Sequence, residues 1–315
     1  MTLREYQRGD YRGVAELWKR NPSDEGPLLG LDPDAVGEML HKGERLGFRF
    51  LLGMARVLGR PIIVVLVVDV DGKVSGTTML TFTPKAGYVS GVVVDSNIRR
   101  QGHAQAMMRT CDTLCQRYHR PYVVLDVFSQ NEPALNLYSR MGYQLLREGF
   151  WFSRSLAPDE LIPRPSDNTR VRPFRRSDGP QLAELDNSQM SPEVRGIIPR
   201  RSRDYQVDPL LQSVMKSESE AWVVEAEGRP AGFARVTMSA TFAATQLTPT
   251  LFPTKDREEV SRDLLLTALQ WIRDRKAPRV VTDLPQHRIL SRSVLESNGF
   301  VESQGLRTLV RKLPS

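Results

Sequence analysis

The sequence predicts two tandem α/β domains, each built on a mixed, mostly antiparallel sheet flanked by helices. The length of 315 residues exceeds what one hydrophobic core usually supports. Strand and helix patterns recur in the same order in both halves of the chain. Residues 3–17 also realign with residues 171–185, and the identical pairs are Arg4/Arg172, Arg8/Arg176, Asp10/Asp178, Ala15/Ala183, Glu16/Glu184 and Leu17/Leu185.

The segment between the two halves contains Pro158, Pro163 and Pro165, which preclude regular structure. We therefore expect domains at residues 1–157 and 170–315, joined by a stiff linker at residues 158–169. Two copies of this size make tandem domains, because the repeats of solenoid proteins are only about 20 to 50 residues long.

The elements of the first half follow from local patterns. Apolar, β-branched runs predict strands, apolar residues at helical spacing predict helices, and Asp71-Gly72 between two such runs predicts a tight hairpin. Asp10 and Asp178 are placed to cap the helices that follow them. In chain order we expect a strand at 3–6, a helix at 10–20, a less regular helical region at 33–58, strands at 61–70, 74–83 and 87–94, a helix at 103–118, a strand at 122–127, a helix at 131–141 and a hairpin at 143–154.

The second half repeats this order by the same criteria, with Glu227-Gly228 as the tight turn. In chain order we expect strands at 221–226, 231–238 and 243–249, a helix at 256–274, a strand at 279–283, a helix at 288–298 and a final hairpin.

Composition narrows the class of protein. The net charge of +7 divides into +4 for residues 1–157 and +3 for the rest, so neither half is a concentrated basic module and we expect no nucleic-acid partner. Cys111 and Cys115 lie one helical turn apart, which suits neither a disulfide nor a zinc site, so we expect two core thiols and no metal. No apolar run is long enough to cross a bilayer, and the first ten residues lack a signal region. We expect a cytoplasmic protein.

The junction between the third long strand and the next helix indicates an anion site. A strand that breaks into a glycine-containing loop and then starts a helix leaves several backbone N–H groups unpaired near the positive helix end. Such a place binds phosphate. This loop lacks the Lys-Ser/Thr of a P-loop and the first glycine of a dinucleotide fingerprint; its residues are Arg99, Arg100, Gln101, Gly102, His103 and Ala104.

Two motifs in the first half resemble those of the GNAT superfamily of N-acyltransferases. VVVDSNIRRQGHAQAMM at residues 92–108 is similar to the family's strand, loop and helix with the signature Q/R-x-x-G-x-G/A. NEPALNLYSRMGY at residues 131–143 is similar to its N-x-x-A-x-x-L-Y-x-x-x-G-F/Y. The two motifs occur in the family's order, separated by a helix and a strand, and the resemblance covers most of residues 1–155.

The resemblance implies an acetyltransferase that uses acetyl-CoA as cosubstrate. The pantetheine arm is expected to pair with the strand just after a bulge at Gly91, where the sheet splays open. Backbone N–H groups of residues 100 to 105 are expected to hold the pyrophosphate, with the side chain of Arg99 or Arg100 assisting and His103 starting the helix. The implied coenzyme-binding residues are Val92, Val93, Val94, Arg99, Arg100, Gln101, Gly102, His103, Ala104, Gln105 and Asn131.

Acyl transfer needs a neutral amine, a donor for the oxyanion and stabilisation of the departing thiolate. By the resemblance, the donor is a backbone N–H of the strand at 87–94 and the group that assists the thiolate is Tyr138. Some relatives carry a glutamate base on that strand, but GYVSGVVV has no carboxylate. A water relay stays open as an alternative, and so does a carboxylate from Asp24, Glu25, Asp126 or Glu148.

The second half departs from both motifs. Residues 249–255 contain two prolines and no glycine, and Leu295 stands opposite Tyr138. We therefore expect a degenerate domain and one coenzyme per chain. The leading function is transfer of an acetyl group to a primary amine of a small molecule or peptide. The alternatives are a non-catalytic acetyl-CoA sensor or scaffold, and an acetyltransferase like mycothiol synthase, whose tandem layout is similar.

Overall fold

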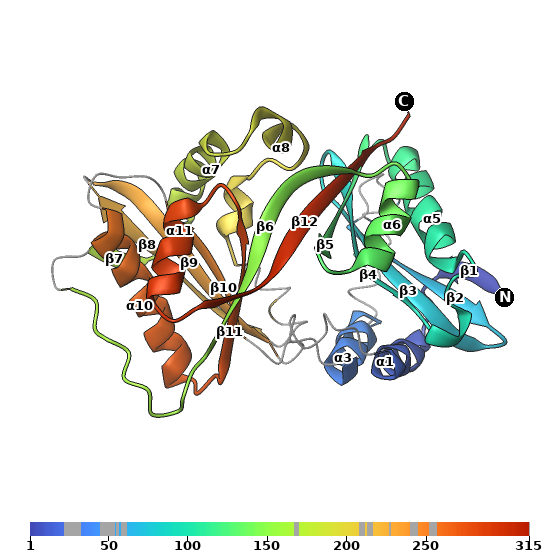
Figure 1. Ribbon diagram of the computed structural model, residues 1–315, viewed down its shortest axis with the longest axis horizontal. Coiled ribbons are helices and arrows are strands. Elements are labelled where there is room, and N and C mark those ends of the chain that lie inside the picture. The colour runs from blue at the N-terminus through green and yellow to red at the C-terminus, as the bar shows by residue number, and fades with distance from the viewer. Residues whose placement is uncertain are drawn as a thin grey trace. The chain divides into compact units, whose positions relative to one another are not determined.

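The computed structural model describes residues 1–21, 33–44, 62–166, 170–207, 217–226, 228–239, 245–251 and 257–314, together with residues 54, 57 and 212. The chain forms two compact units. Unit 1 takes the described residues up to Leu146 and those from Arg307 on, whereas unit 2 takes Arg147–Leu306. Both units carry a mixed sheet with helices packed against it, which confirms the predicted fold class (Figure 1).

The sheet of unit 1 has the strand order β1-β2-β3-β4-β5-β12. Neighbours from β1 to β4 are antiparallel, and β4 and β5 are parallel. Figure 1 shows α1 beside α3. The elements are β1 (Thr2–Glu5), α1 (Asp10–Arg20), α3 (Pro33–Gly43), β2 (Ile63–Val70), β3 (Lys73–Phe82), β4 (Ala86–Val94), the 3-10 turn Ser96–Ile98, α5 (His103–Arg117), β5 (Tyr122–Phe128), α6 (Glu132–Arg140) and the second part of β12 (Val301–Lys312).

The two faces of this sheet carry separate cores. On one face α5 and α6 pack on alternate residues of the strands, among them Val89 and Leu125. On the other face α1 places Val14 and Leu17 against β2 and β3. Cys111 and Cys115 lie fully buried in the first core, as predicted, and burial raises the pKa of Cys115 to about 12.

The sheet of unit 2 has the strand order β6-β11-β10-β9-β8-β7, again with one parallel pair, β10 and β11. The elements from β7 to α11 thus repeat those from β1 to α6 in chain order, and β6 has the place beside β11 that β12 has beside β5. The elements are β6 (Gln144–Ser155), β7 (Arg170–Pro173), α7 (Gly179–Ser188), α8 (Pro192–Ile197), β8 (Ser217–Ala226), β9 (Arg229–Ser239), β10 (Thr245–Leu251), α10 (Arg257–Asp274), β11 (Arg279–Pro285) and α11 (Ile289–Ser297), with 3-10 turns at Arg176–Asp178 and Ser202–Tyr205.

The two predicted terminal hairpins were wrong: β6 and β12 are single strands of 12 residues each. Gly149, inside the predicted hairpin at 143–154, lies within β6 opposite Pro285 of β11. A Cβ there would lie 2.8 Å from the carbonyl oxygen of Leu284, so the glycine permits close approach of two strands.

Because of these long strands, the boundaries of the two compact units differ from those of the two sequence halves. Residues 149–155 of β6 pair with β11 of unit 2, although they precede the proline-rich segment. Leu309 and Leu313, from the end of the chain, lie in the core of unit 1 beside Leu125. The division at 157 and 170 therefore describes the sequence repeat, while each compact unit takes a strand segment from across it.

The residues shared by the two copies form the same corner in both units. Arg4 Nη1 lies 2.6 Å from Asp10 Oδ2, and Arg172 Nη1 lies 2.8 Å from Asp178 Oδ2. The prediction that these aspartates cap their helices was wrong. Each carboxylate instead accepts a hydrogen bond from the backbone N–H three residues earlier. Asp10 accepts it from Gln7 at 2.6 Å, and Asp178 accepts it from Arg175 at 2.7 Å. The pair ties the first strand to the helix that follows.

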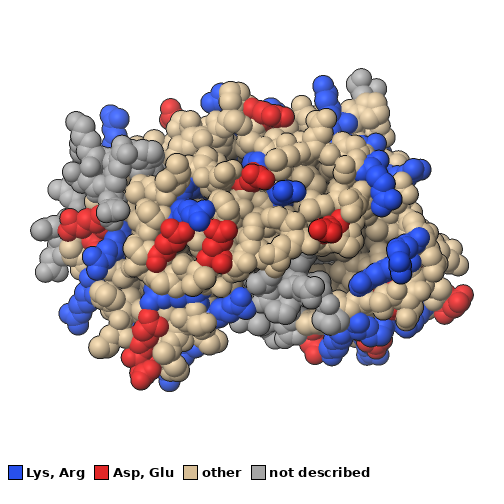
Figure 2. All heavy atoms as spheres, in the orientation of Figure 1, with Lys and Arg blue, Asp and Glu red and all other residues tan. Residues whose placement is uncertain are grey.

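On the face drawn in Figure 2, the described residues show basic and acidic side chains side by side over the left and centre, and basic side chains are more frequent at the right. Among the helices of the described residues, none is long and apolar enough to cross a membrane. The same part of the chain contains no group of three or more His, Cys, Asp or Glu side chains that could hold a metal ion.

Candidate functional site

The strand β4 carries a bulge at Gly91, as predicted. Its register against β3 shifts between Thr77 and Met79, and Gly91 has a φ of 61°, in the left-handed region. A Cβ at this position would lie 3.3 Å from the indole ring of Trp18 on α1. Trp18 of α1 therefore packs against the bulge, and glycine at position 91 suits both the left-handed backbone angle and this close contact.

The sheet opens just before this bulge. The parallel pairing of β4 with β5 runs from Ala86–Tyr122 to Val89–Leu125, and among the described residues no strand pairs with β4 on that side beyond Val89. On its other side β4 stays paired with β3 through Val93 and Val94. The last residues of β4, which include the predicted Val92, Val93 and Val94, thus form one edge of a fork between β4 and β5.

The loop after β4 exposes a row of backbone donors. The first bond of α5 runs from Ala106 N to Gly102 O at 2.9 Å, and no acceptor within the described part of the chain is recorded for the N–H groups of residues 100 to 105. Arg100 and Gly102 both have left-handed backbones, with φ of 63° and 85°. Such alternating conformations turn successive N–H groups toward one point and form an anion-binding concavity at the positive end of α5.

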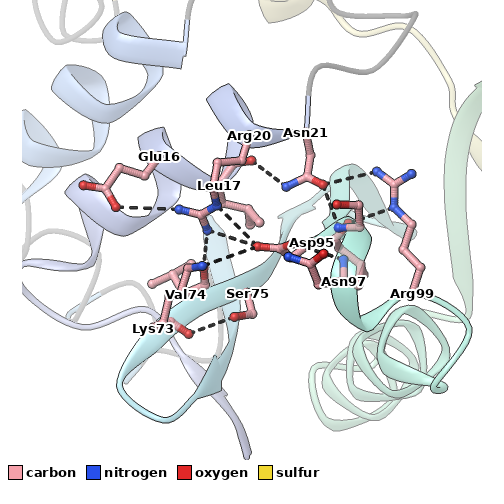
Figure 3. A network of polar contacts seen from close by, with 12 residues as sticks. Glu16, Leu17, Arg20, Asn21, Lys73, Val74, Ser75, Asp95, Asn97 and Arg99 are labelled. Atoms are coloured by element: carbon pink, nitrogen blue, oxygen red, sulfur yellow. Dashed lines mark hydrogen bonds and ion pairs between the residues drawn. The ribbon is translucent and has the colours of Figure 1, made fainter.

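A polar network holds this loop against α1 (Figure 3). Arg20 Nη2 lies 3.2 Å from Asp95 Oδ2, and Asp95 also accepts the N–H of Asn97 at 3.2 Å. Asn21 Oδ1 accepts the N–H of Ser96 at 2.7 Å. Burial opposes ionisation of Asp95, but the bond from Asn97 and the bond and charge of Arg20 outweigh it, so its pKa lies below the ordinary value. The sequence reasoning missed this network.

The side chains of the predicted loop residues have different surroundings. Arg99 folds back, with Nε 3.1 Å from the carbonyl oxygen of Val94 and Nη2 3.4 Å from Asn21 Oδ1. Arg100, Gln101 and Gly102 are exposed, whereas His103 is buried at the start of α5. Ala104 and Gln105, in its first turn, are half-buried.

The second motif forms α6 on the α5 face of the sheet. Asn131 is the N-cap of this helix, since its Oδ1 accepts the N–H of Ala134 at 3.2 Å. Tyr138 is 6% exposed and lies in the core cluster with Leu125 and Val92 at the fork, its ring centre 5.7 Å from that of Tyr143. The motif therefore brings Tyr138 to the same face as the opening between β4 and β5.

The opposite face of the fork carries a carboxylate. Asp126, one of the candidate bases, lies on β5 one residue beyond the last pair with β4 and is exposed. It accepts hydrogen bonds from the hydroxyl groups of Tyr88 and Thr308, the latter at 2.6 Å. Of the other candidates, Glu148 belongs to unit 2, and Asp24 and Glu25 lie outside the described residues.

The corresponding fork of unit 2 is filled by the chain itself. The pairing of β10 with β11 is recorded only at Thr245–Val280 and Gln246–Val281. Beyond it, the buried Arg288 donates from Nη1 to the carbonyl oxygen of Pro249 at 3.0 Å and from Nη2 to Asp186 Oδ1 at 2.5 Å. Tyr205 donates to the other oxygen of Asp186 at 2.7 Å.

The loop that follows β10, at residues 252–256, lies outside the described residues. Leu295, opposite Tyr138 in the repeat, is buried and lines a small apolar cavity with Pro249 and Ser291. In this unit a leucine therefore faces the region that Tyr138 faces in unit 1.

Comparisons with known proteins agree with this geometry. Residues 43–143 match the family model described as the acetyltransferase (GNAT) family. An "L-amino acid N-acetyltransferase AaaT" of Escherichia coli is 34% identical over 95 residues, which are 29% of this chain and 59% of that protein. "GCN5-related N-acetyltransferase 10, chloroplastic" of Arabidopsis thaliana is 31% identical over 93 residues, 29% of this chain and 36% of its own length. The matches thus span only part of these relatives.

Among solved structures, a tandem GNAT protein from the clavulanic acid biosynthesis pathway has the same fold over the whole chain. The TM-score is 0.67, with 13% identity and coverage of 100% of this chain and 99% of that one. The family match thus covers residues 43–143, and the whole chain has the fold of a tandem GNAT protein.

Proposed function

We propose that the protein is an acetyl-CoA-dependent N-acetyltransferase that acts on a primary amine, and that the reaction takes place in unit 1. The observation that carries this proposal is the junction of three features at one place: the open edge of β4, the row of N–H groups at residues 100 to 105, and Tyr138 beside the fork. Orphaned N–H groups with left-handed neighbours suit a pyrophosphate.

In this proposal the backbone of Val92, Val93 and Val94 holds the pantetheine arm. The pyrophosphate lies on the loop from Arg99 to Gln105. In the structure, the side chain of Arg99 donates a hydrogen bond to the carbonyl oxygen of Val94. When the coenzyme binds, this side chain turns to the phosphates, and the pantetheine amide takes its place on the oxygen. Asn131 supports the site by fixing the start of α6.

Tyr138 assists the departing thiolate. A thiol has a pKa of about 8.5 and a tyrosine of about 10, so complete proton transfer from an ordinary tyrosine is uphill by about 2 kcal/mol. The hydroxyl therefore acts mainly by donating a hydrogen bond to the sulfur as its charge develops. The effect of removing the hydroxyl should therefore not exceed about a hundredfold, the low end of general acid–base effects.

The acceptor class to test first is the α-amino group of amino acids, because the Escherichia coli relative is named as an L-amino acid N-acetyltransferase. Small alkylamines, peptide N-termini and peptide lysines complete the panel. Release of thiol from acetyl-CoA is followed for each amine, and the acetylated product is identified by mass spectrometry.

We expect Tyr138→Phe to lower kcat by about ten- to a hundredfold while the Kd for coenzyme A stays within about twofold. Tyr118→Phe is the matched control, because Tyr118 lies in the same core cluster at the far end of α5. An unchanged kcat in Tyr138→Phe would remove this residue from the mechanism. Coenzyme binding without transfer to any amine of the panel would replace the enzyme with an acetyl-CoA sensor.

A further inference from the structure

Three adjacent strands of unit 1 bring their side chains together at the mouth of the fork. Tyr88 comes from β4, Asp126 from β5 and Thr308 from β12, the last strand of the chain. The Tyr88 hydroxyl bonds to Asp126 Oδ2, and the Thr308 hydroxyl bonds to Asp126 Oδ1. Thr308 is 3% exposed, whereas Asp126 is exposed. The carboxylate is thus fixed from both sides and still faces solvent.

This carboxylate and Tyr138 belong to opposite faces of the sheet. Val123, Leu125 and Val127 of β5 pack into the core under α5 and α6, where Tyr138 also lies. Side chains alternate along a strand, so Asp126 points to the other face. The fork therefore carries a group suited to a thiolate on one side and a group suited to a cation on the other.

We propose that Asp126 binds the amino group of the acceptor and receives the proton that its nitrogen loses, with Tyr88 and Thr308 as positioning residues. The inference rests on the proposed function. The ammonium ion first gives one proton to Asp126, which passes it on to water and so frees the nitrogen lone pair. When this lone pair forms the C–N bond, the C–S bond breaks and its electron pair leaves with the sulfur. The nitrogen then gives its second proton to Asp126 and on to water, and the thiolate takes up one proton from water as it leaves. The substrate class is a primary amine that arrives as an ammonium ion.

The second copy supplies a contrast. Asp283 occupies the same position in β11 that Asp126 occupies in β5, the fifth residue of a seven-residue strand, and it is also exposed. Gln246, opposite Val281, stands where Tyr88 stands opposite Val124. Within the described residues the carboxylate of Asp283 accepts no hydrogen bond from a hydroxyl group, and the Thr282 hydroxyl bonds instead to the backbone carbonyl oxygen of Asp283, at 3.2 Å. The pair of oriented hydroxyls is therefore a feature of unit 1, beside the intact loop.

The experiment measures acetyl transfer to the best amine of the panel in the full-length protein. For Asp126→Asn we expect kcat/KM for the amine to fall by about a hundredfold or more, with the larger part in KM, while the Kd for coenzyme A stays within about twofold. Asp283→Asn is the matched control and keeps kcat/KM. Asp126→Glu, which keeps the charge, restores part of the loss.

The two positioning residues, Tyr88 and Thr308, are tested by the KM for the amine. Thr308→Val and Tyr88→Phe each raise the KM for the amine by about tenfold with a smaller change in kcat, and Thr308→Ser returns KM toward the wild-type value. An unchanged KM in Asp126→Asn, in an enzyme that acetylates the amine, would overturn the inference and leave the proposed function standing. A parallel loss of coenzyme binding would make Asp126 structural, which also overturns it. A wild-type protein that acetylates no amine would remove the proposed function and this inference together.

Discussion

Gly102 and Arg100 show how single residues shape the loop. A left-handed backbone is unfavourable for a side chain with a Cβ by roughly 1 to 2 kcal/mol, and Arg100 nevertheless adopts it. Gly102 also has a left-handed backbone, and as a glycine it adopts this conformation without that penalty. No atom lies within 4 Å of a Cβ built at position 102, so in the free protein the glycine is required by its backbone angle and not by a neighbour.

We therefore expect Gly102→Ala to separate stability from coenzyme binding. Strain should lower the free energy of unfolding by about 1 kcal/mol, and the added methyl group, or a backbone that relaxes away from the left-handed region, should raise the Kd for coenzyme A by at least about tenfold. Titration calorimetry and thermal melting measure the two effects.

Gly72→Ala is the matched control, because Gly72 has a φ of 80° and open space around its Cβ but lies in the turn between β2 and β3. It should show the same loss of stability with no change in Kd. Equal Kd values in both variants would mean that the backbone at Gly102 does not approach the coenzyme.

At the scale of elements, the corner between the first strand and first helix is the best preserved feature of the duplication. In unit 2, Arg172 bridges Asp178 of the turn and Glu225 of β8, at 2.8 and 2.7 Å. In unit 1, Arg4 bridges Asp10 and Asp69 in the same way. These charge-assisted bonds explain why arginine and aspartate, rather than any apolar pair, recur at these positions.

Asp178→Asn should lower the free energy of unfolding at pH 7 by about 1.5 to 3 kcal/mol, the range for hydrogen bonds to charged groups. The hydrogen bond from Arg172 is the main cause that lowers the pKa of Asp178, and burial opposes it. A carboxyl group whose pKa is lowered by folding contributes its stability above the unfolded value of about 3.9. The contribution is lost as the pH falls below that value.

The difference in stability between the wild-type protein and Asp178→Asn should thus be constant from pH 7 to about pH 5 and shrink below about pH 4. Urea unfolding followed by tryptophan fluorescence measures it, since unit 2 holds Trp151, Trp222 and Trp271. A difference that persists undiminished at pH 3 would show that the stabilisation does not depend on the charge of Asp178.

Local patterns predicted most elements but not their long-range partners. The helix at 10–20 and the turn at Asp71-Gly72 each follow from a few neighbouring residues, whereas the bulge at Gly91 was expected from the family resemblance. The structure confirms all three. The single strands β6 and β12 were missed, because a glycine in a strand and a glycine in a turn have the same local signal.

The carboxylate cluster at the fork could not be predicted for a related reason. Thr308 and Asp126 are 182 residues apart in the chain, and only the insertion of β12 beside β5 brings them together. Likewise, Asp10 was predicted to cap a helix because capping is the commonest local use of aspartate there. Instead, Asp10 accepts a hydrogen bond from Arg4 on the preceding strand.

At the scale of the whole molecule, one fold occurs twice with different contents at the fork. Unit 1 leaves the edge of β4 open and supplies hydroxyl and carboxylate groups around it. Unit 2 closes the same place with the buried ion pair of Arg288 and Asp186. Burial opposes ionisation of Asp186, but the charges of Arg288 and Arg200 favour it more strongly, so the pKa of Asp186 is lowered. Breaking such a buried pair costs about 3 to 5 kcal/mol, which a weak ligand cannot supply.

We therefore expect one coenzyme A per chain. In unit 2 the carbonyl oxygen of Pro249 is already bonded to Arg288, and Pro249 has no N–H to offer a pantetheine arm. Calorimetry should give a stoichiometry near one. Hydrogen exchange with saturating coenzyme A should protect residues 92–94 and 100–105 and leave residues 247–251 unchanged, because bound ligand suppresses opening only where it contacts the fold. Two coenzymes per chain, or protection in β10, would mean that Arg288 yields its place and that both units are competent to bind.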